Sequence, residues 1–360
     1  MRLGLSVPKM NAGAGADGGG GPILSSVKEG AEAFLSRTAG KALLMADSAA
    51  FSALLPASRL SRAVSLIYDG DALAPFALSD VGCVLASGGA DVLRAARFFA
   101  EVRRLPCALF PTQAACDGAF ETSARVRLSG QEMQVRLADA DVVCDLTLMH
   151  NSMAEGYARI LLTRLALFEA KMLGRICRRP FGGAAYEEAF FLTDGVHALR
   201  AEEIVKINAR VRVLEEQGAP IGEGTVLRER YAGVPIPALY AQRALSALYY
   251  AALKKGVPRR YFVPDYRARA AAAGTKYADQ AVPAPSEYAA RAMALERARG
   301  ELLTEIVHLR REHPAQLREI RTQVRLLPFT PDLHELNCLP ERAPGGLCAV
   351  LRDFGLLENI

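Results

Sequence analysis

Two short segments of the sequence combine glycines and polar groups in a way that can serve a phosphate-bearing ligand. Ser87-Gly88-Gly89-Ala90 separates an apolar run from a stretch with helical spacing. Glycines at such a junction let the backbone approach a ligand closely, and the first turn of the helix offers unpaired N–H groups to a pyrophosphate. The segment PTQAACDG, residues 111–118, adds a hydroxyl, a thiol and a carboxylate. A tight turn and a loop capped by Thr112 or Asp117 explain the same residues without any ligand.

These segments need an α/β fold to position them. Four short apolar runs have the length and composition of buried strands, namely Lys41–Ala46, Ala63–Ile67, Val81–Ala86 and Cys107–Phe110. Ala90–Arg103 has helical spacing and follows the glycines. Strands that alternate with helices predict a mostly parallel sheet, in which ligands bind beyond the carboxyl ends of the strands.

The pattern changes near residue 150. Arg125–Leu128 and Met133–Leu137 are predicted to pair as a hairpin, and Asp141–Leu148 is predicted as a last strand. Helices are predicted beyond that point, at Ala154–Leu173, Glu187–Leu199, Ala201–Gln217, Pro237–Lys255 and within Glu287–Leu327. We therefore expect a flexible Gly-rich segment (1–21), an α/β dinucleotide-binding domain (22–148) and a helical domain (149–360), with the site in the cleft between the two domains.

Composition excludes several classes of protein. The chain has 360 residues, of which 51% are hydrophobic and 23% charged, so global disorder is excluded. No uncharged apolar run approaches the ~20 residues of a membrane helix, and the N-terminus lacks a secretory signal, which favours a cytoplasmic protein without membrane insertion. A net charge of +5 is too small to indicate nucleic-acid binding. Seven scattered cysteines without a CxxC pair argue against a disulfide framework and a Cys-type zinc site. Cys116 is interpreted as a packing thiol and not as a nucleophile, because no histidine lies near it in sequence.

Taken together, the segments resemble the metal-dependent polyol dehydrogenases of the dehydroquinate-synthase-like superfamily, with sn-glycerol-1-phosphate dehydrogenase as the most similar branch. KALLMADS (41–48) is similar to the strand whose last Asp contacts the adenosine ribose, which implies that role for Asp47. GGADVLRAAR (88–97) is similar to GGGxVIDVAK, which implies a pyrophosphate site at Gly88, Gly89, Ala90 and Asp91.

Two further segments carry the resemblance into the second half of the site. PTQAACDG is similar to PTxASxDG, which implies that Thr112, Ala115 and Asp117 line the nicotinamide and substrate region. PALYAQRALSALYYAALKKG (237–256) is similar to the family's PALHGEQxxxG helix. The resemblance therefore implies a Rossmann-like domain followed by a helical domain, NAD or NADP as cofactor, and a polyol or phosphorylated polyol as substrate. It leaves the oligomeric state open, although the family often forms dimers or larger assemblies.

The metal site of that family has no counterpart in this sequence. The family's one Asp and two His ligands correspond to Arg159, Val226 and Tyr240, and no histidine occurs between His197 and His308. Arginine, valine and tyrosine do not form such a site, so no metal is expected there. The glycine that becomes Ala90 also weakens the cofactor turn in principle.

Three interpretations follow. A divergent dehydrogenase could replace the metal with the charge of Arg159 and a proton from Tyr240, while Asp117 orients a hydroxyl; the simpler alternative is that Arg159 and Tyr240 only fill the vacated space. A nucleotide-binding pseudoenzyme would keep the cofactor turn alone. An interaction protein would keep only the fold.

Overall fold

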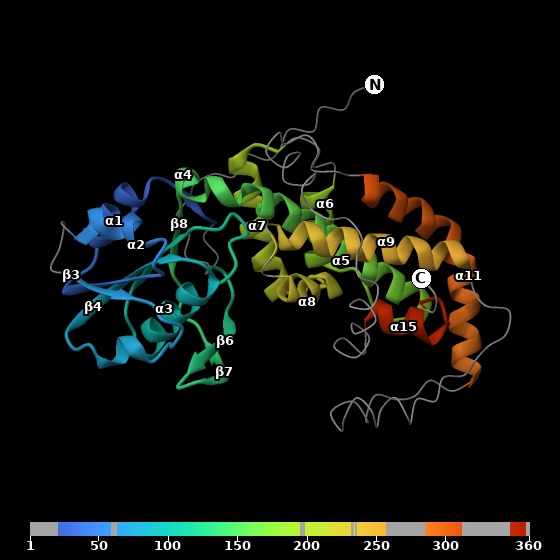
Figure 1. Cartoon of the computed structure of the whole chain (residues 1–360), viewed down its shortest axis with the longest axis horizontal. Coiled ribbons are helices and arrows are strands. Elements are labelled where there is room, and N and C mark those ends of the chain that lie inside the picture. Colours follow the sequence, from blue (N-terminus) through green and yellow to red (C-terminus); the bar gives the residue numbers. More distant parts are fainter. Residues whose placement is uncertain are drawn as a thin grey trace.

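The computed structural model describes residues 21–58, 63–194, 199–231, 234, 236–256, 285–311 and 346–357. Most of the predicted segment 1–21, together with His197, His313, His334 and Cys338, lies outside these ranges. Within them, the chain forms a sheet with its covering helices, followed by a group of packed helices (Figure 1).

A six-stranded parallel sheet occupies the first part of the chain. Its strands run in the order β1-β8-β5-β4-β2-β3, and every neighbouring pair is parallel. The bounds are β1 Ile23–Leu24, β2 Lys41–Ala46, β3 Ala63–Ile67, β4 Val81–Gly88, β5 Cys107–Pro111 and β8 Asp141–Cys144. β6 (Ser123–Leu128) and β7 (Gln131–Arg136) form the predicted antiparallel hairpin, which projects from one end of the sheet (Figure 1).

Helices cover both faces of the sheet, as a parallel sheet requires. α1 (Val27–Leu35) and α2 (Phe51–Ser58) share one buried apolar cluster with one face of the central strands. α3 (Ala90–Arg103) packs on the other face, and its core continues into the helical part of the chain. α3 ends at Arg104, whose φ of 53° places it in the left-handed region typical of a helix C-terminus.

The second part of the described chain is helical throughout. Its elements are α4 (Leu146–Met149), α5 (Met153–Cys177), α6 (Ala184–Thr193), α7 (Ala201–Glu216), α8 (Glu223–Arg230), α9 (Pro237–Lys255), α11 (Pro285–Arg311) and α15 (Leu347–Asp353), with a short 3-10 turn at His150–Ser152. Another 3-10 turn, Ala74–Ala77, lies between β3 and β4 in the sheet part. No helix in the described ranges is long and apolar enough to cross a membrane. The predicted α/β part followed by helices is confirmed; the domain boundary at residue 148 falls inside α4 and remains a prediction.

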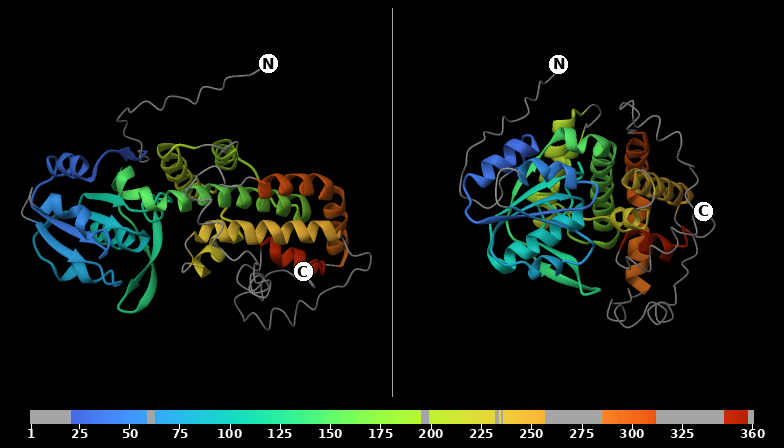
Figure 2. Two further views of the ribbon diagram at one scale, coloured as in Figure 1. Left: turned by 45° about the horizontal axis from the view of Figure 1, so that its top comes forward. Right: turned by 60° about the vertical axis from the view of Figure 1, so that its left-hand side comes forward.

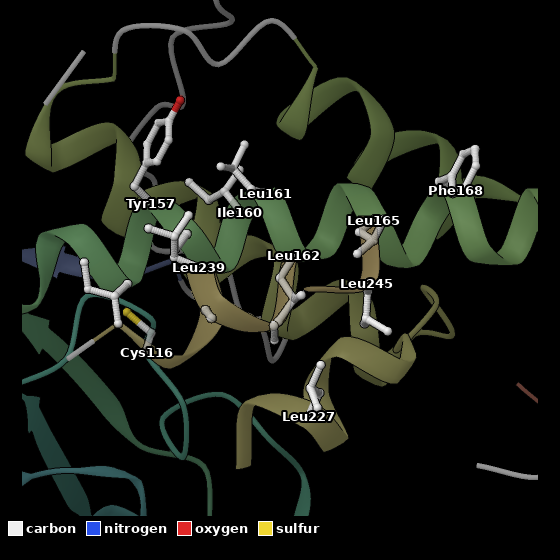
Figure 3. Close-up of a cluster of buried hydrophobic side chains, with 14 of the residues drawn as sticks. Cys116, Tyr157, Ile160, Leu161, Leu162, Leu165, Phe168, Leu227, Leu239 and Leu245 are labelled. Carbon is white, nitrogen blue, oxygen red and sulfur yellow. The ribbon is translucent and has the colours of Figure 1, made fainter. Parts of the chain in front are cut away.

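α5 is the central helix of this second part. It lies beside α9 in both views of Figure 2 and also contacts α6, α7, α8, α11 and α15. Leu162 and Leu165 of α5 point toward Leu227 of α8 and Leu245 of α9, while Cys116 reaches the same buried cluster from the loop after β5 (Figure 3). One apolar core therefore joins the loop at the sheet edge to the helices.

Candidate functional site

Two strand ends meet where the order of strands in the sheet reverses. β2 and β4 are neighbours, but the chain continues from β2 to β3 on one side and from β4 to β5 on the other. Asp47 directly follows β2, Gly88 ends β4, and Gly89 is the N-cap of α3. In open parallel sheets, ligands bind at such a switch point beyond the carboxyl ends. The fold thus brings together three of the residues that the sequence predicts to bind a cofactor.

The side chain of Asp47 reaches from the end of β2 to the turn between β4 and α3. Its Oδ2 accepts the N–H of Gly89 at 3.0 Å, and its Oδ1 accepts the N–H of Ala50 at 2.7 Å. Gly88 has a φ of 147°, and a Cβ built on it would lie 2.4 Å from Asp47 Oδ2. The glycine at position 88 is therefore required by the close approach of the Asp47 carboxylate as well as by its backbone conformation.

The first turn of α3 has the features of an anion site. Gly89 is the N-cap, and no side chain caps the helix. A Cβ on Gly89 would meet only Gln113 Nε2, at 3.5 Å. Ala90 is half-buried, and the exposed Asp91 pairs with Arg94 at 3.5 Å. The N-terminal amides of α3 are thus not satisfied by a capping side chain, which leaves them suited to an anionic group.

The loop after β5 is held firmly against this turn. Thr112 donates its N–H to Gly88 O at 3.1 Å, and the Thr112 carbonyl accepts from Ser152 Oγ at 3.1 Å. Gly118 has a φ of 81°, and a Cβ there would lie 2.6 Å from Ala90 O. Ala115 is completely buried. Thr112 therefore lies against the predicted cofactor turn, and the Ala115 side chain is enclosed by protein.

Arg94 and Arg97 stabilise the same loop. Arg94 makes a bidentate pair with Glu121 at 2.7 and 2.8 Å, and Glu121 accepts the N–H of Gly118 at 3.1 Å. The buried Arg97 donates to Ala138 O at 2.7 Å and to Gly118 O at 3.2 Å. Arg94 and Arg97 occupy the positions of the Asp and Lys in the family motif GGGxVIDVAK. In this chain they attach the loop after β5 to α3.

Three arginines from the helical part surround Asp117. Arg228 Nη2 lies 2.6 Å from Asp117 Oδ2, and Arg212 Nη1 and Arg159 Nε lie 3.5 and 4.0 Å from Oδ1. Asp117 is 8% exposed and Arg159 is 2% exposed. The carboxylate that was predicted to orient a substrate hydroxyl is therefore engaged by guanidinium groups on two sides.

Two glutamates complete this buried ion-pair network. Arg212 donates to both oxygens of Glu215 at 2.6 and 2.7 Å, and Arg159 Nη2 lies 3.7 Å from Glu215 Oε1. Arg228 also donates to Glu155 Oε1 at 2.7 Å. With Asp117, the network contains three cationic and three carboxyl side chains, which is the balance that buried charges require.

The network connects to the first turn of α9 and to α8. Glu155 Oε2 accepts the N–H of Ala238 at 3.0 Å, and Arg159 Nη1 donates to Thr225 Oγ1 at 3.2 Å. Tyr240 lies two residues beyond Ala238, and its ring packs on Tyr231 with centroids 4.2 Å apart. In the described ranges Tyr240 has no hydrogen bond to Asp117 or Arg159. The structure thus brings Asp117 and Arg159 together, whereas the ring of Tyr240 packs on Tyr231.

Burial and charge act against each other on these groups. Burial raises the pKa of Asp117, but Arg228, Arg212 and Arg159 outweigh it and hold that pKa well below its usual range. Burial, followed by the charge of Arg212, lowers the pKa of Arg159 to about 10, so the guanidinium stays charged at neutral pH. Burial also raises the pKa of Glu215, despite Arg212 and Arg159.

Comparisons with known proteins identify the fold. No family model and no curated protein sequence matches the chain. Among solved structures, the iron-containing alcohol dehydrogenase from Thermotoga maritima aligns with a TM-score of 0.52 and 10% identity over 93% of this chain and 96% of that one. A second iron-containing alcohol dehydrogenase aligns with a TM-score of 0.51 and 10% identity over 94% and 97%. The chain has the fold of the iron-containing alcohol dehydrogenases. Glycerol dehydrogenase from Schizosaccharomyces pombe is also similar, with a TM-score of 0.45 and 12% identity over 85% and 92%.

The residues at the network do not fit the metal that this fold family implies. Guanidinium groups of three arginines lie within 4.0 Å of Asp117, the carboxylate nearest to the predicted substrate position. A cation bound to Asp117 would meet these fixed positive charges. Val226 offers no donor atom, and within the described ranges no three His, Cys, Asp or Glu side chains are grouped to hold a metal ion. No step of the chemistry is therefore assigned to a metal.

Sequence reasoning missed most of the network. Arg212 and Glu215 form an (i, i+3) pair on α7 that is common on exposed helix surfaces, so nothing in the sequence marks it as buried. Arg228 and Glu155 meet only through the tertiary fold. The correspondence of Val226 to one of the family's histidine ligands is the one indication in the sequence that α8 borders the site.

Proposed function

We propose that this protein binds NAD or NADP at the switch point of its sheet and no longer performs metal-assisted hydride transfer on a polyol. The observation that supports it is the contrast between two adjacent regions: the first turn of α3 lacks a capping side chain, whereas Asp117 is surrounded by arginines. The fold is that of the iron-containing alcohol dehydrogenases, and the uncapped amides at the start of α3 support a pyrophosphate site at the switch point.

The residues assigned to the nucleotide follow from their positions. The α3 amides after Gly89 would hold the pyrophosphate. Asp47 has carboxylate lone pairs beyond the two backbone bonds that it accepts, and it would receive the ribose hydroxyls. Thr112 and Ala115 would border the nicotinamide end. This assignment rests on the resemblance and on the placement of these residues at one sheet edge.

Calorimetric titration with NADH and NADPH, before and after treatment with a chelator, tests the proposal. Metal content is measured on the same sample. We expect saturable binding of at least one nucleotide that the chelator leaves unchanged, and no turnover of glycerol or dihydroxyacetone phosphate with added zinc. Absence of binding up to millimolar nucleotide, or stoichiometric zinc whose removal abolishes binding, contradicts the proposal.

A metal-free reductase is the second candidate, because one feature of the network favours it. Arg159 Nε and Arg212 Nε are buried and have no hydrogen-bond partner within the described residues. Two unsatisfied donors beside Asp117 could polarise the carbonyl of a ketone derived from a polyol or phosphorylated polyol. NADPH or NADH oxidation that depends on dihydroxyacetone phosphate, persists in chelator and is lost in both Arg159→Lys and Tyr240→Phe would favour this candidate over the first.

A further inference from the structure

A second buried polar cluster lies in the helical part of the chain, away from the sheet. It is formed by Glu169 of α5, Glu223 at the start of α8, Tyr249 of α9 and Cys348 of α15. Glu169 and Glu223 are 4% and 5% exposed, and Tyr249 and Cys348 are fully buried. Residues from α5, α8, α9 and α15 therefore meet at two carboxyl groups and one phenol.

The hydrogen bonds of Tyr249 determine how many protons the cluster holds. Tyr249 Oη lies 2.8 Å from Glu169 Oε1 and 2.8 Å from Glu223 Oε2. A phenol has one proton, so it donates to only one of the two carboxyl groups. The other oxygen–oxygen contact at this distance requires a proton on a carboxyl group. The closed cluster therefore contains one protonated glutamic acid.

The backbone contacts indicate which glutamate carries that proton. Both oxygens of Glu223 accept the N–H of Cys348 at 3.1 Å, in the first turn of α15, where a negative charge is favourable. Glu169 Oε2 accepts the N–H of Glu223 at 2.8 Å and leaves Oε1 to face the phenol. The proton thus lies on Glu169, which donates to Tyr249, and Tyr249 donates to the ionised Glu223.

The surroundings of Glu169 and Glu223 agree with the placement of the proton on Glu169. Burial, followed by the charge of Glu223, raises the pKa of Glu169 to about 8, and burial also raises the pKa of Glu223. Tyr249 and Cys348 are the other titratable groups that face the pair, and burial raises the pKa of each. On α11, Glu301 and Glu305 pair instead with Lys171, two residues beyond Glu169.

The cluster fixes the position of α15. Gly346 packs so closely on Glu223 that a Cβ there would lie 1.8 Å from Oε1. The two carboxyl groups also border a cavity of about 390 Å³, which gives water access to them. If Glu169 loses its proton, two negative charges share one phenol in a buried site, and moving Glu223 away from Cys348 relieves the repulsion.

We propose that Glu169, Tyr249 and Glu223 form a proton-dependent clasp that holds α15 on the helical part of the chain and opens as the shared carboxyl proton is lost. Opening releases the N–H of Cys348 and frees the segment from Gly346 onward. The clasp residues lie on α5, α8, α9 and α15, whereas the proposed nucleotide site lies at the ends of β2 and β4, so the clasp does not rest on the proposed nucleotide site.

Hydrogen exchange of the full chain at several pH values tests the clasp. Above the usual glutamate value of 4.5 and below about 8, each pH unit should increase the opening equilibrium about tenfold, because one proton is released on opening. After correction for intrinsic exchange rates, the protection of the amides of Cys348–Leu351 should fall about 100-fold from pH 6 to pH 8.

Glu169→Gln is the decisive variant, since its amide can donate to Tyr249 at every pH. We expect α15 protection that does not vary with pH in this variant, while Glu188→Gln, a surface change on α6, keeps the slope of the wild type. Should Glu169→Gln fail to fold, Glu223→Gln also removes one carboxyl group and is expected to give a flat profile. Wild-type protection that is constant from pH 6 to 8, or a slope that survives in these variants, overturns the proposal.

Discussion

Arg228 donates to Asp117 at 2.6 Å, and this contact joins α8 of the helical part to the loop after β5 of the sheet part. Arg228 reaches Glu155 of α5 with the same guanidinium. The fixed charge therefore lies between carboxylates from both parts of the chain. The guanidinium group of Arg228 thus balances the negative charge of Asp117.

Removal of the Asp117 charge should destabilise the protein strongly. Asp117→Asn leaves the buried guanidinium groups of Arg159 and Arg212, and the half-buried one of Arg228, with fewer compensating charges. We therefore expect a loss of about 3–5 kcal/mol in the free energy of unfolding. Chemical denaturation at pH 7 measures it. The matched control is Glu188→Gln, which breaks the exposed pair with Arg210 at 2.6 Å and should cost at most about 1 kcal/mol. Equal effects of the two changes would show that the network is not a buried unit.

The Asp117 carboxylate should also dominate the decrease in the free energy of unfolding at acidic pH. The pKa of Asp117 is depressed in the folded state, so its contribution is present above the unfolded value of about 3.9 and is lost as the pH falls below it. We expect wild-type stability to decrease more steeply than that of Asp117→Asn between about pH 4 and pH 2. Thermal unfolding across that range compares the two proteins, and parallel curves would contradict the expectation.

The substitution Gly89→Asp should reduce nucleotide binding without impairing folding. Gly89 has an extended conformation and room for a side chain, and Asp is a favourable N-cap, so Gly89→Asp should fold normally. A negative charge about 4 Å from a phosphate costs roughly 4 kcal/mol near a protein surface, so NAD(P)H affinity should fall at least about 100-fold. Gly89→Ser, a neutral N-cap, is the control and should retain most of the affinity. Unchanged binding in Gly89→Asp would place the nucleotide elsewhere.

Gly346→Ala should weaken the attachment of α15. The added methyl would lie 1.8 Å from Glu223 Oε1, so the carboxylate must move, and overpacking of this kind costs about 1–3 kcal/mol. Gly300→Ala on α11 is the control, because a Cβ there meets nothing within 4 Å. That change should stabilise the protein by roughly 0.5–1 kcal/mol through helix propensity. Differential scanning calorimetry distinguishes the two results by their opposite signs.

Local sequence patterns predicted much of the fold, because buried strands and amphipathic helices leave a clear apolar periodicity in the sequence. β2, β3, α3 and α9 have the bounds that the apolar runs and helical spacing indicate. The prediction of one strand over Asp141–Leu148 was wrong in its second half. Asp145 accepts the N–H of Thr147 at 2.9 Å and caps α4, so the strand ends at Cys144.

Polar and short elements were not predictable in the same way. α8 has the sequence EGTVLRER, whose few apolar residues give no clear helical face, and yet it carries both Glu223 and Arg228. The resemblance placed Asp117 and Arg159 in one region, where the structure confirms that they are neighbours at 4.0 Å. Their roles, and those proposed for Asp47, Gly88, Gly89, Ala90, Asp91, Thr112, Ala115 and Tyr240, remain predictions.

The pairing of β1 with β8 has a consequence for the order of events during synthesis. Ile23 lies opposite Val143, and the first turn of α1 is anchored by a bond of 3.0 Å from the Val27 N–H to Asp145. These partners do not exist until residues 143–145 have left the ribosome, so the outer edge of the sheet cannot form while the nascent chain is shorter. β1 therefore remains unpaired until β8 has been synthesised. Pairing of β1 with β8 becomes the final step in assembling the sheet.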